Sequence, residues 1–128
     1  HESLSFDGPT GPYLLYTLAR MRSIQRKTEQ QPQKQKAGLL VTEKEKELIA
    51  LLSKKNEIIA SALRHFSPHV LAHYLLEVAN TFNTYYHETK IIQENKELES
   101  ARLALLHSLD AVLEEGLYLL GIEPLDEM

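Results

Sequence analysis

Hydrophobic positions recur at helical spacing along much of the chain. The clearest stripe has members three or four residues apart: Leu71, Leu75, Val78, Phe82 and Tyr85. Such spacing places side chains on one face of an amphipathic α-helix. Ser67 followed by Pro68 is a start signal, because serine is a favoured N-cap and proline is tolerated in the first helical turn. The pattern predicts a long helix from Pro68 to about His87.

The same reasoning predicts four further helices. A cluster of glycine and proline precedes a stripe that should form a helix from Pro12 to about Lys27. Thr42 and Glu45 form a capping box, in which each side chain satisfies a backbone N–H group at a helix start. The other expected helices cover, approximately, residues 43–53, 57–65 and 95–120, with Gly121 as a left-handed cap. Because no segment alternates apolar and polar residues as a strand does, we expect an all-α bundle of about five helices.

A polar segment interrupts this pattern. Residues 29–36 read EQQPQKQK and contain no apolar side chain. Such a segment cannot bury enough surface to offset the entropy lost on ordering. We therefore expect a mobile loop over residues 29–37 within a single domain of residues 1–128.

Composition narrows the function classes. The chain has 128 residues, 43% of them hydrophobic, and no cysteine. Disulfides, thiolate metal sites and cysteine nucleophiles are therefore excluded, and the composition fits a reducing cytoplasmic setting. No apolar run is as long as a membrane span, so no membrane partner is expected. Glycine-rich phosphate loops and nucleophile elbows are also absent.

Two groups of side chains are candidates for ligand contact, and neither is decisive alone. The net charge is -4, yet basic residues gather in the first helix at Arg20, Arg22, Arg26 and Lys27. They could bind phosphate or form an ordinary solvated face. Tyr13 and Tyr86 lie near helix ends, where their rings could cap the core or stack on nucleobases. His65, His69 and His73 lack an obvious further ligand, and Pro68 breaks the helix between them, so we expect no metal site.

Four segments resemble, in order, the motifs of one family. Residues 5–20, SFDGPTGPYLLYTLAR, resemble the opening of the C-terminal, DALR-type anticodon-binding domain of arginyl-tRNA synthetases. The later motifs of that domain resemble PHVLAHYL at 68–75 with FNTYYH at 82–87, ARLAL at 101–105 and GLYLLGI at 116–122.

The resemblance implies a class I synthetase anticodon-binding bundle whose ligand is the anticodon arm of arginine tRNA. Its anticodon contacts fall on Tyr13, Thr17, Tyr86 and Met128. It also implies a separate catalytic domain as partner, which would use ATP and Mg²⁺; no cofactor is expected in these residues, which would be inactive alone as a fragment of the enzyme. The terminal methionine is a further point of resemblance.

The chemistry of base recognition leads to a mechanism for such a domain. Proteins that recognise RNA sequence act mainly on unpaired loops, where bases can stack on aromatic rings. All arginine codons have guanine in the middle, so we expect strict recognition of the central anticodon cytosine. We expect that cytosine to be held between Tyr13 and Tyr86, with the basic residues of the first helix on phosphates. The alternative is a non-catalytic helical protein-interaction domain, which would bind RNA only through charge.

Overall fold

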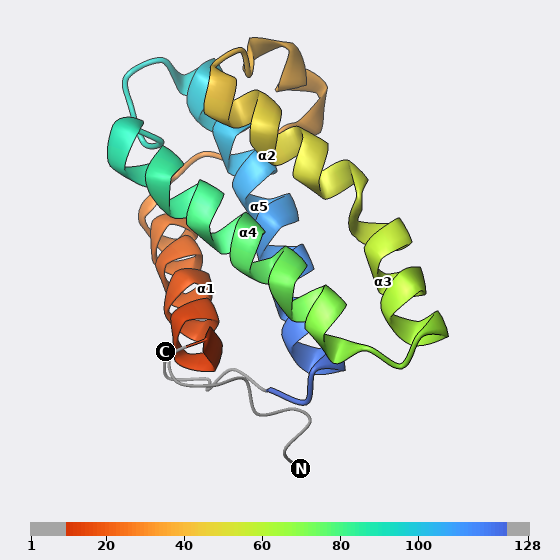
Figure 1. Ribbon diagram of the computed structural model, residues 1–128. Coiled ribbons are helices and arrows are strands. Elements are labelled where there is room, and N and C mark those ends of the chain that lie inside the picture. Colours follow the sequence, from red (N-terminus) through yellow and green to blue (C-terminus); the bar gives the residue numbers. More distant parts are fainter. Residues whose placement is uncertain (1–9, 123–128) are drawn as a thin grey trace.

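The computed structural model describes residues 10–122 and is helical throughout its regular structure (Figure 1). Five α-helices and one 3-10 helix lie in this range: α1 Thr10–Lys27, η2 Lys34–Leu39, α2 Glu43–Ser53, α3 Lys55–Arg64, α4 Pro68–Glu88 and α5 Lys96–Leu119. The prediction of an all-α bundle with five α-helices is confirmed. None of the helices within residues 10–122 combines the length and apolar content needed to cross a membrane.

Helices α1 and α5 run antiparallel. At one end of the pair, the Thr28 hydroxyl donates a hydrogen bond to Glu99 in the first turn of α5. At the other end, a Cβ on Gly11 would lie 3.6 Å from Cδ1 of Ile122, just beyond α5. Helix α4 crosses in front of α5, while α2 and α3 cover the side away from α1 (Figure 1).

The predicted stripe of α4 forms the centre of the core. Leu75, Val78 and Phe82 have no exposed surface. Helix α5 approaches α4 closely at Gly116, where a Cβ would lie 2.5 Å from Cδ1 of Leu75. The glycine of the GLYLLGI motif is therefore required by packing. Ser67 precedes α4 as expected, but its side chain makes no capping hydrogen bond.

Glu45 joins three helices through a buried carboxylate. Its Oε1 accepts from the backbone N–H of Thr42 at 3.0 Å, which completes the predicted capping box of α2. Its Oε2 accepts from the Tyr85 hydroxyl of α4 at 2.7 Å and from Nε of Arg102 of α5 at 2.6 Å. Burial alone would raise the pKa of Glu45, but these hydrogen bonds outweigh it and hold the pKa below its ordinary value.

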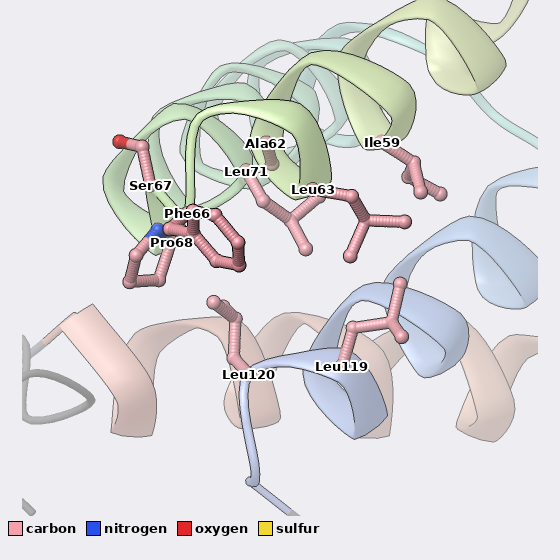
Figure 2. A pocket seen from close by; sticks show the side chains of 9 residues that line it. All are labelled: Ile59, Ala62, Leu63, Phe66, Ser67, Pro68, Leu71, Leu119 and Leu120. Carbon is pink, nitrogen blue, oxygen red and sulfur yellow. The ribbon is translucent and has the colours of Figure 1, made fainter.

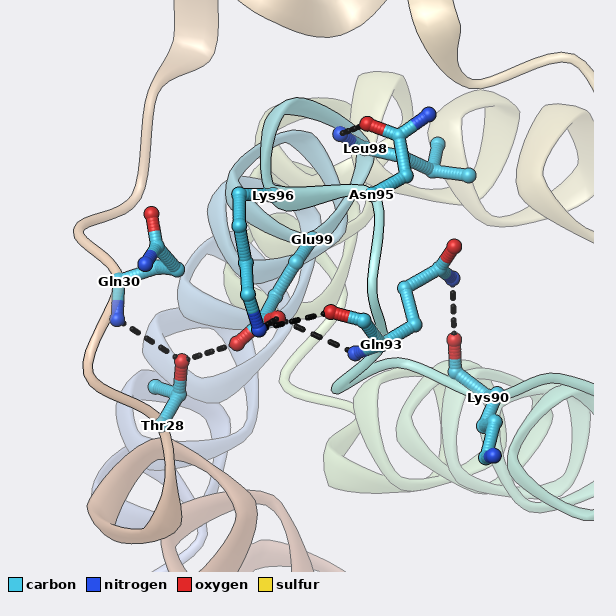
Figure 3. A network of polar contacts seen from close by, with 8 residues as sticks. All are labelled: Thr28, Gln30, Lys90, Gln93, Asn95, Lys96, Leu98 and Glu99. Carbon is cyan, nitrogen blue, oxygen red and sulfur yellow. Dashed lines mark hydrogen bonds and ion pairs between the residues drawn. The ribbon is translucent and has the colours of Figure 1, made fainter.

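A second buried carboxylate anchors the end of α1. Glu99 is 1% exposed and accepts from Thr28, from the Gln93 backbone N–H at 3.1 Å and from Lys96 Nζ at 3.1 Å (Figure 3). Burial opposes ionisation here too, yet the hydrogen bonds and Lys96 keep the pKa of Glu99 below its ordinary value. The end of α1, the α4–α5 connection and the start of α5 are therefore held together at one point.

The polar segment after α1 differs in part from its prediction. The prediction of a loop over residues 29–37 is wrong from Lys34 onward, where the 3-10 helix η2 begins. This region packs on α5: the Gln33 backbone N–H donates to the Ser100 carbonyl at 3.2 Å, and Lys36 pairs with Glu97 at 3.6 Å. Backbone and charged contacts order it, and hydrophobicity alone does not reveal such contacts.

The corner between α3 and α4 has an unusual backbone. The Ser67 N–H donates to the Ala62 carbonyl at 2.9 Å and the Phe66 N–H to the Leu63 carbonyl at 3.4 Å. This pair of bonds is a Schellman motif, which normally places glycine at the left-handed position. Here the position is occupied by Phe66, with φ of 49° and a side chain 91% exposed. The residue is therefore strained without a compensating contact in the described chain.

We predict that Glu45→Gln lowers the free energy of unfolding by about 3 kcal/mol, because it leaves the largely buried Arg102 without its counter-charge. The pKa of Glu45 lies below its ordinary value, so its contribution to stability is complete above the ordinary pKa of glutamate and is lost as the pH falls through the folded-state value. Urea unfolding between pH 3 and 7 should show weaker acid destabilisation in the variant. Glu47→Gln, on the exposed face of the same helix, should change stability by less than about 0.5 kcal/mol. Equal losses of unfolding free energy in both variants would contradict the stabilising role of the buried Glu45 carboxylate.

We predict that Phe66→Gly raises the free energy of unfolding by about 0.5–1 kcal/mol. Glycine relieves the left-handed strain, although it makes the unfolded chain more flexible. Little buried surface is lost, because the phenylalanine ring is almost fully exposed. Thermal unfolding measures the change. His65→Gly is the matched control: His65 has φ of -104°, so this variant should be less stable than the unmodified protein.

Candidate nucleic-acid interface

Helices α1 and α4 lie side by side and run parallel. Residues later in α1 contact residues later in α4: Tyr13 bonds to Asn80, and Arg20, two turns further along α1, bonds to Asn83. The Tyr13 hydroxyl donates to Asn80 Oδ1 at 2.7 Å, and Nη1 of Arg20 donates to Asn83 Oδ1 at 2.8 Å. One polar and aromatic row therefore follows the seam between the helices.

Asn83 is the centre of this row. Its Nδ2 donates to the Tyr13 hydroxyl and to Thr17 Oγ1, both at 3.0 Å, while its Oδ1 accepts from Arg20. All the groups it bonds lie on α1, so a single amide sets the relation between the two helices at this point. The neighbouring side chains are held in defined positions before any ligand arrives.

Thr17 is completely buried, which corrects its predicted role. Its hydroxyl donates to the Tyr13 carbonyl at 3.0 Å and accepts from Asn83. The prediction that Thr17 contacts a base directly is wrong for this arrangement, because the side chain has no surface to offer. Thr17 instead holds Asn83, and through Asn83 the hydroxyl of Tyr13.

Arg20 lies between two aromatic rings. Its Cζ is 4.3 Å from the ring centroid of Tyr86 and 4.9 Å from that of Tyr16, and it donates a hydrogen bond to the Tyr16 hydroxyl. Contacts of this kind are attractive because the ring face is electronegative. The guanidinium therefore supports the exposed ring of Tyr86 from one side and adds positive charge beside it.

Tyr86 also borders a surface hollow of about 380 Å³. The residues lining it come from the ends of α1 and α4 and the segment that follows α4: Ile24, Lys27, Tyr86, His87, Thr89, Lys90, Ile91 and Ile92. An aromatic ring beside two lysines in a shallow hollow suits a nucleotide, since the ring can stack on a base and the lysines can face its phosphates.

The basic residues of α1 divide between two faces. Nη2 of Arg22 lies 3.1 Å from Asp110 and 2.9 Å from Glu114, both on α5. Arg22 therefore fastens α1 to α5, and because two carboxylates already pair with it, its role as a phosphate-binding residue stays a prediction. Arg26 and Lys27 are exposed at the end of α1, where their roles stay predictions.

The structure gathers Tyr13, Thr17, Arg20 and Tyr86 into one row, whereas Met128 lies outside the described residues. Sequence analysis did not identify Asn80 and Asn83 as site residues. Their signal is the spacing of three between Asn80, Asn83 and Tyr86, which places them on one side of a helix. Within residues 10–122, no three acidic or histidine side chains are grouped so that they could hold a metal ion.

Comparison with known proteins identifies the same class of domain. A family model described as the DALR anticodon binding domain matches residues 14–128. The chain is 36% identical to an arginine–tRNA ligase of Parabacteroides distasonis, over 99% of this chain and 22% of the ligase. It is 42% identical to arginine–tRNA ligase 1 of Bacillus cereus, over 98% of this chain and 22% of the ligase.

A solved structure agrees with the sequence matches. The arginyl-tRNA synthetase of Thermus thermophilus matches 97% of this chain with a TM-score of 0.82 and 36% sequence identity, over 22% of its own length. The chain thus spans about 22% of the length of these relatives. Because the family model covers nearly the whole sequence, the chain belongs to the DALR anticodon-binding domain family.

Proposed function

We propose that this chain is the C-terminal, anticodon-binding part of an arginine–tRNA ligase and that the α1–α4 row binds the anticodon loop of arginine tRNA. The complete ligase would join arginine to that tRNA in the cytoplasm, with ATP and Mg²⁺ used by its catalytic body. The family match and the similarity to arginine–tRNA ligases support this assignment. Nothing in the comparisons favours the alternative of a protein-interaction domain.

The observation that carries the proposal is the position of Tyr86. Tyr86 is 37% exposed, and its ring rests on the Arg20 guanidinium and borders the hollow that contains Lys27 and Lys90. An RNA base that leaves its loop could stack on this ring, while the two lysines of the same hollow could contact the phosphates of the RNA backbone. Phosphate contacts position a nucleic acid, and contacts to base edges specify it.

The Tyr13 end of the row would supply specificity. Tyr13 is half-buried and its hydroxyl already joins Asn80 and Asn83, so a base edge that reaches it meets hydrogen-bonding groups in fixed positions. Hydrogen-bonding groups held in fixed directions accept only a base edge with complementary donors and acceptors, which is the basis of discrimination by such a site. Stacking on Tyr86, in contrast, accepts every base. The proposal thus assigns affinity to one end of the row and specificity to the other.

We predict that Tyr86→Ala weakens binding to arginine tRNA by about 1–3 kcal/mol, the contribution of one base stacked on an aromatic ring. Fluorescence anisotropy at one fixed salt concentration measures the dissociation constant, since salt alone changes such affinities strongly. Tyr118→Ala is the control, because Tyr118 on α5 is 70% exposed and lies outside the row. An equal, small effect of both variants would remove Tyr86 from the site.

We predict that replacing the central anticodon cytosine weakens binding far more than replacing either neighbour. All arginine anticodons share that cytosine, so discrimination at this position should cost about 1–3 kcal/mol, as for a mismatched base. Titration with transcripts that differ at one anticodon position tests this. Indistinguishable affinities for all transcripts would refute anticodon recognition and leave only charge-driven binding.

A further inference from the structure

The corner between α3 and α4 carries an exposed apolar patch on the α3–α5 side of the molecule. Its exposed members are Phe66 at 91%, Leu63 at 64% and Leu119 at 42%. They surround a hollow of about 280 Å³ that reaches Ala62, Leu71 and Leu120. Figure 2 shows Leu63 and Phe66 facing the end of α5, with Leu119 and Leu120 across the hollow.

Two features of Phe66 are costly for the domain alone. A phenylalanine takes the left-handed position of a Schellman motif, and its ring projects into solvent. Glycine would fit the same backbone without strain. Strain that local structure does not require commonly marks a functional surface. Clustered exposed apolar side chains are likewise typical of a surface that a partner covers.

The chemistry of the patch indicates a protein partner. The side chains that line the hollow are almost all aliphatic or aromatic, and none is charged. A nucleic acid needs cations to offset its phosphates, which the α1–α4 row offers and this hollow does not. An aliphatic side chain from another protein surface would fill the hollow and remove Phe66 from water.

The place of the patch in the fold indicates which protein. Leu120 lines the hollow, and Ile122, two residues later, lies against Gly11 in the first turn of α1. The start of α1, the helix into which any preceding domain of a longer chain leads, therefore lies at the same end of the bundle as the patch (Figure 1). The ligases similar to this chain are more than four times as long as the part it matches. A domain attached to the same polypeptide is present near the patch at a high effective concentration. A second copy of this chain reaches that concentration only in concentrated solution, so the attached domain is favoured as the occupant.

We propose that Phe66, Leu63 and Leu119 form the surface on which the preceding catalytic body of the ligase docks, through an apolar protrusion that enters the hollow. This inference rests on the proposed function, because it requires the longer polypeptide. In this proposal the strained corner connects the anticodon-binding domain to the catalytic body of the ligase. A domain fixed at this corner presents its α1–α4 row in a constant direction relative to the catalytic body.

Photocrosslinking in the complete ligase tests the contact directly. A benzophenone amino acid in place of Phe66 should, on irradiation, form an intramolecular crosslink to a peptide outside these 128 residues, identified by mass spectrometry. The same amino acid in place of Val41, which is 65% exposed before α2, is the matched control and should give little such product. Crosslinks only between two copies, or equal yields at both positions, would overturn the proposal.

Aminoacylation kinetics of Phe66→Gly in the complete ligase provide a test that folding failure cannot imitate, because this variant relieves backbone strain. Its tRNA dissociation constant should stay within twofold of the unmodified ligase. Its kcat/KM should fall by about tenfold or more, since small misplacements far from the reacting atoms lower rates strongly. Val41→Ser should leave both unchanged. Unchanged kinetics in Phe66→Gly would overturn the docking surface alone, whereas an unmodified ligase without anticodon-dependent binding would overturn the proposed function.

Discussion

The buried carboxylate of Glu45 is the constraint on which the arrangement of the helices depends. It caps α2, accepts the hydroxyl of Tyr85 from α4 and pairs with Arg102 from α5. An unpaired charge at this depth would cost several kcal/mol, so the three helices must keep the positions that satisfy it. Tyr85 and Tyr86 are adjacent on α4 and differ in burial: the first lies in the core and the second is partly exposed at the surface. The bond that fixes Tyr85 therefore also fixes the direction in which Tyr86 leaves α4.

Contacts to α5 hold helix α1 in place. These contacts are separate from the seam between α1 and α4 that forms the candidate interface. Glu99 holds the end of α1 through Thr28, and Asp110 holds its middle through Arg22. Both carboxylates belong to α5, and α5 also packs closely on α4 at Gly116, so that helix supports both α1 and α4. Asn83 then joins the two supported helices across their seam. The aromatic row is thus preorganised by contacts that lie behind it, and binding a loop would require little reordering of the protein.

Periodicity and capping predicted every α-helix, because the apolar stripes and start signals are local properties of the sequence. The capping box at Thr42 likewise predicted one bond of Glu45, but not its bonds to Tyr85 and Arg102, which depend on residues distant in the chain. The same limit explains the site. A count of basic residues cannot separate Arg20, which faces an aromatic ring, from Arg22, which faces Asp110, because the difference lies in what packs opposite each.

Most of the chain shows agreement between local preference and global fold, and this makes the exception at the α3–α4 corner informative. Gly121 takes its left-handed position at φ of 81° as the sequence pattern predicts, whereas Phe66 takes the equivalent position at the end of α3 without the residue type that suits it. A helix end that can be closed by glycine elsewhere in the same molecule does not need phenylalanine for folding. The residue is therefore better explained by the partner that its exposed ring would contact than by what its backbone requires. The polar row on α1 and α4 and the apolar corner beside α5 would then divide two tasks, contact with RNA and contact with protein, between surfaces of opposite chemistry.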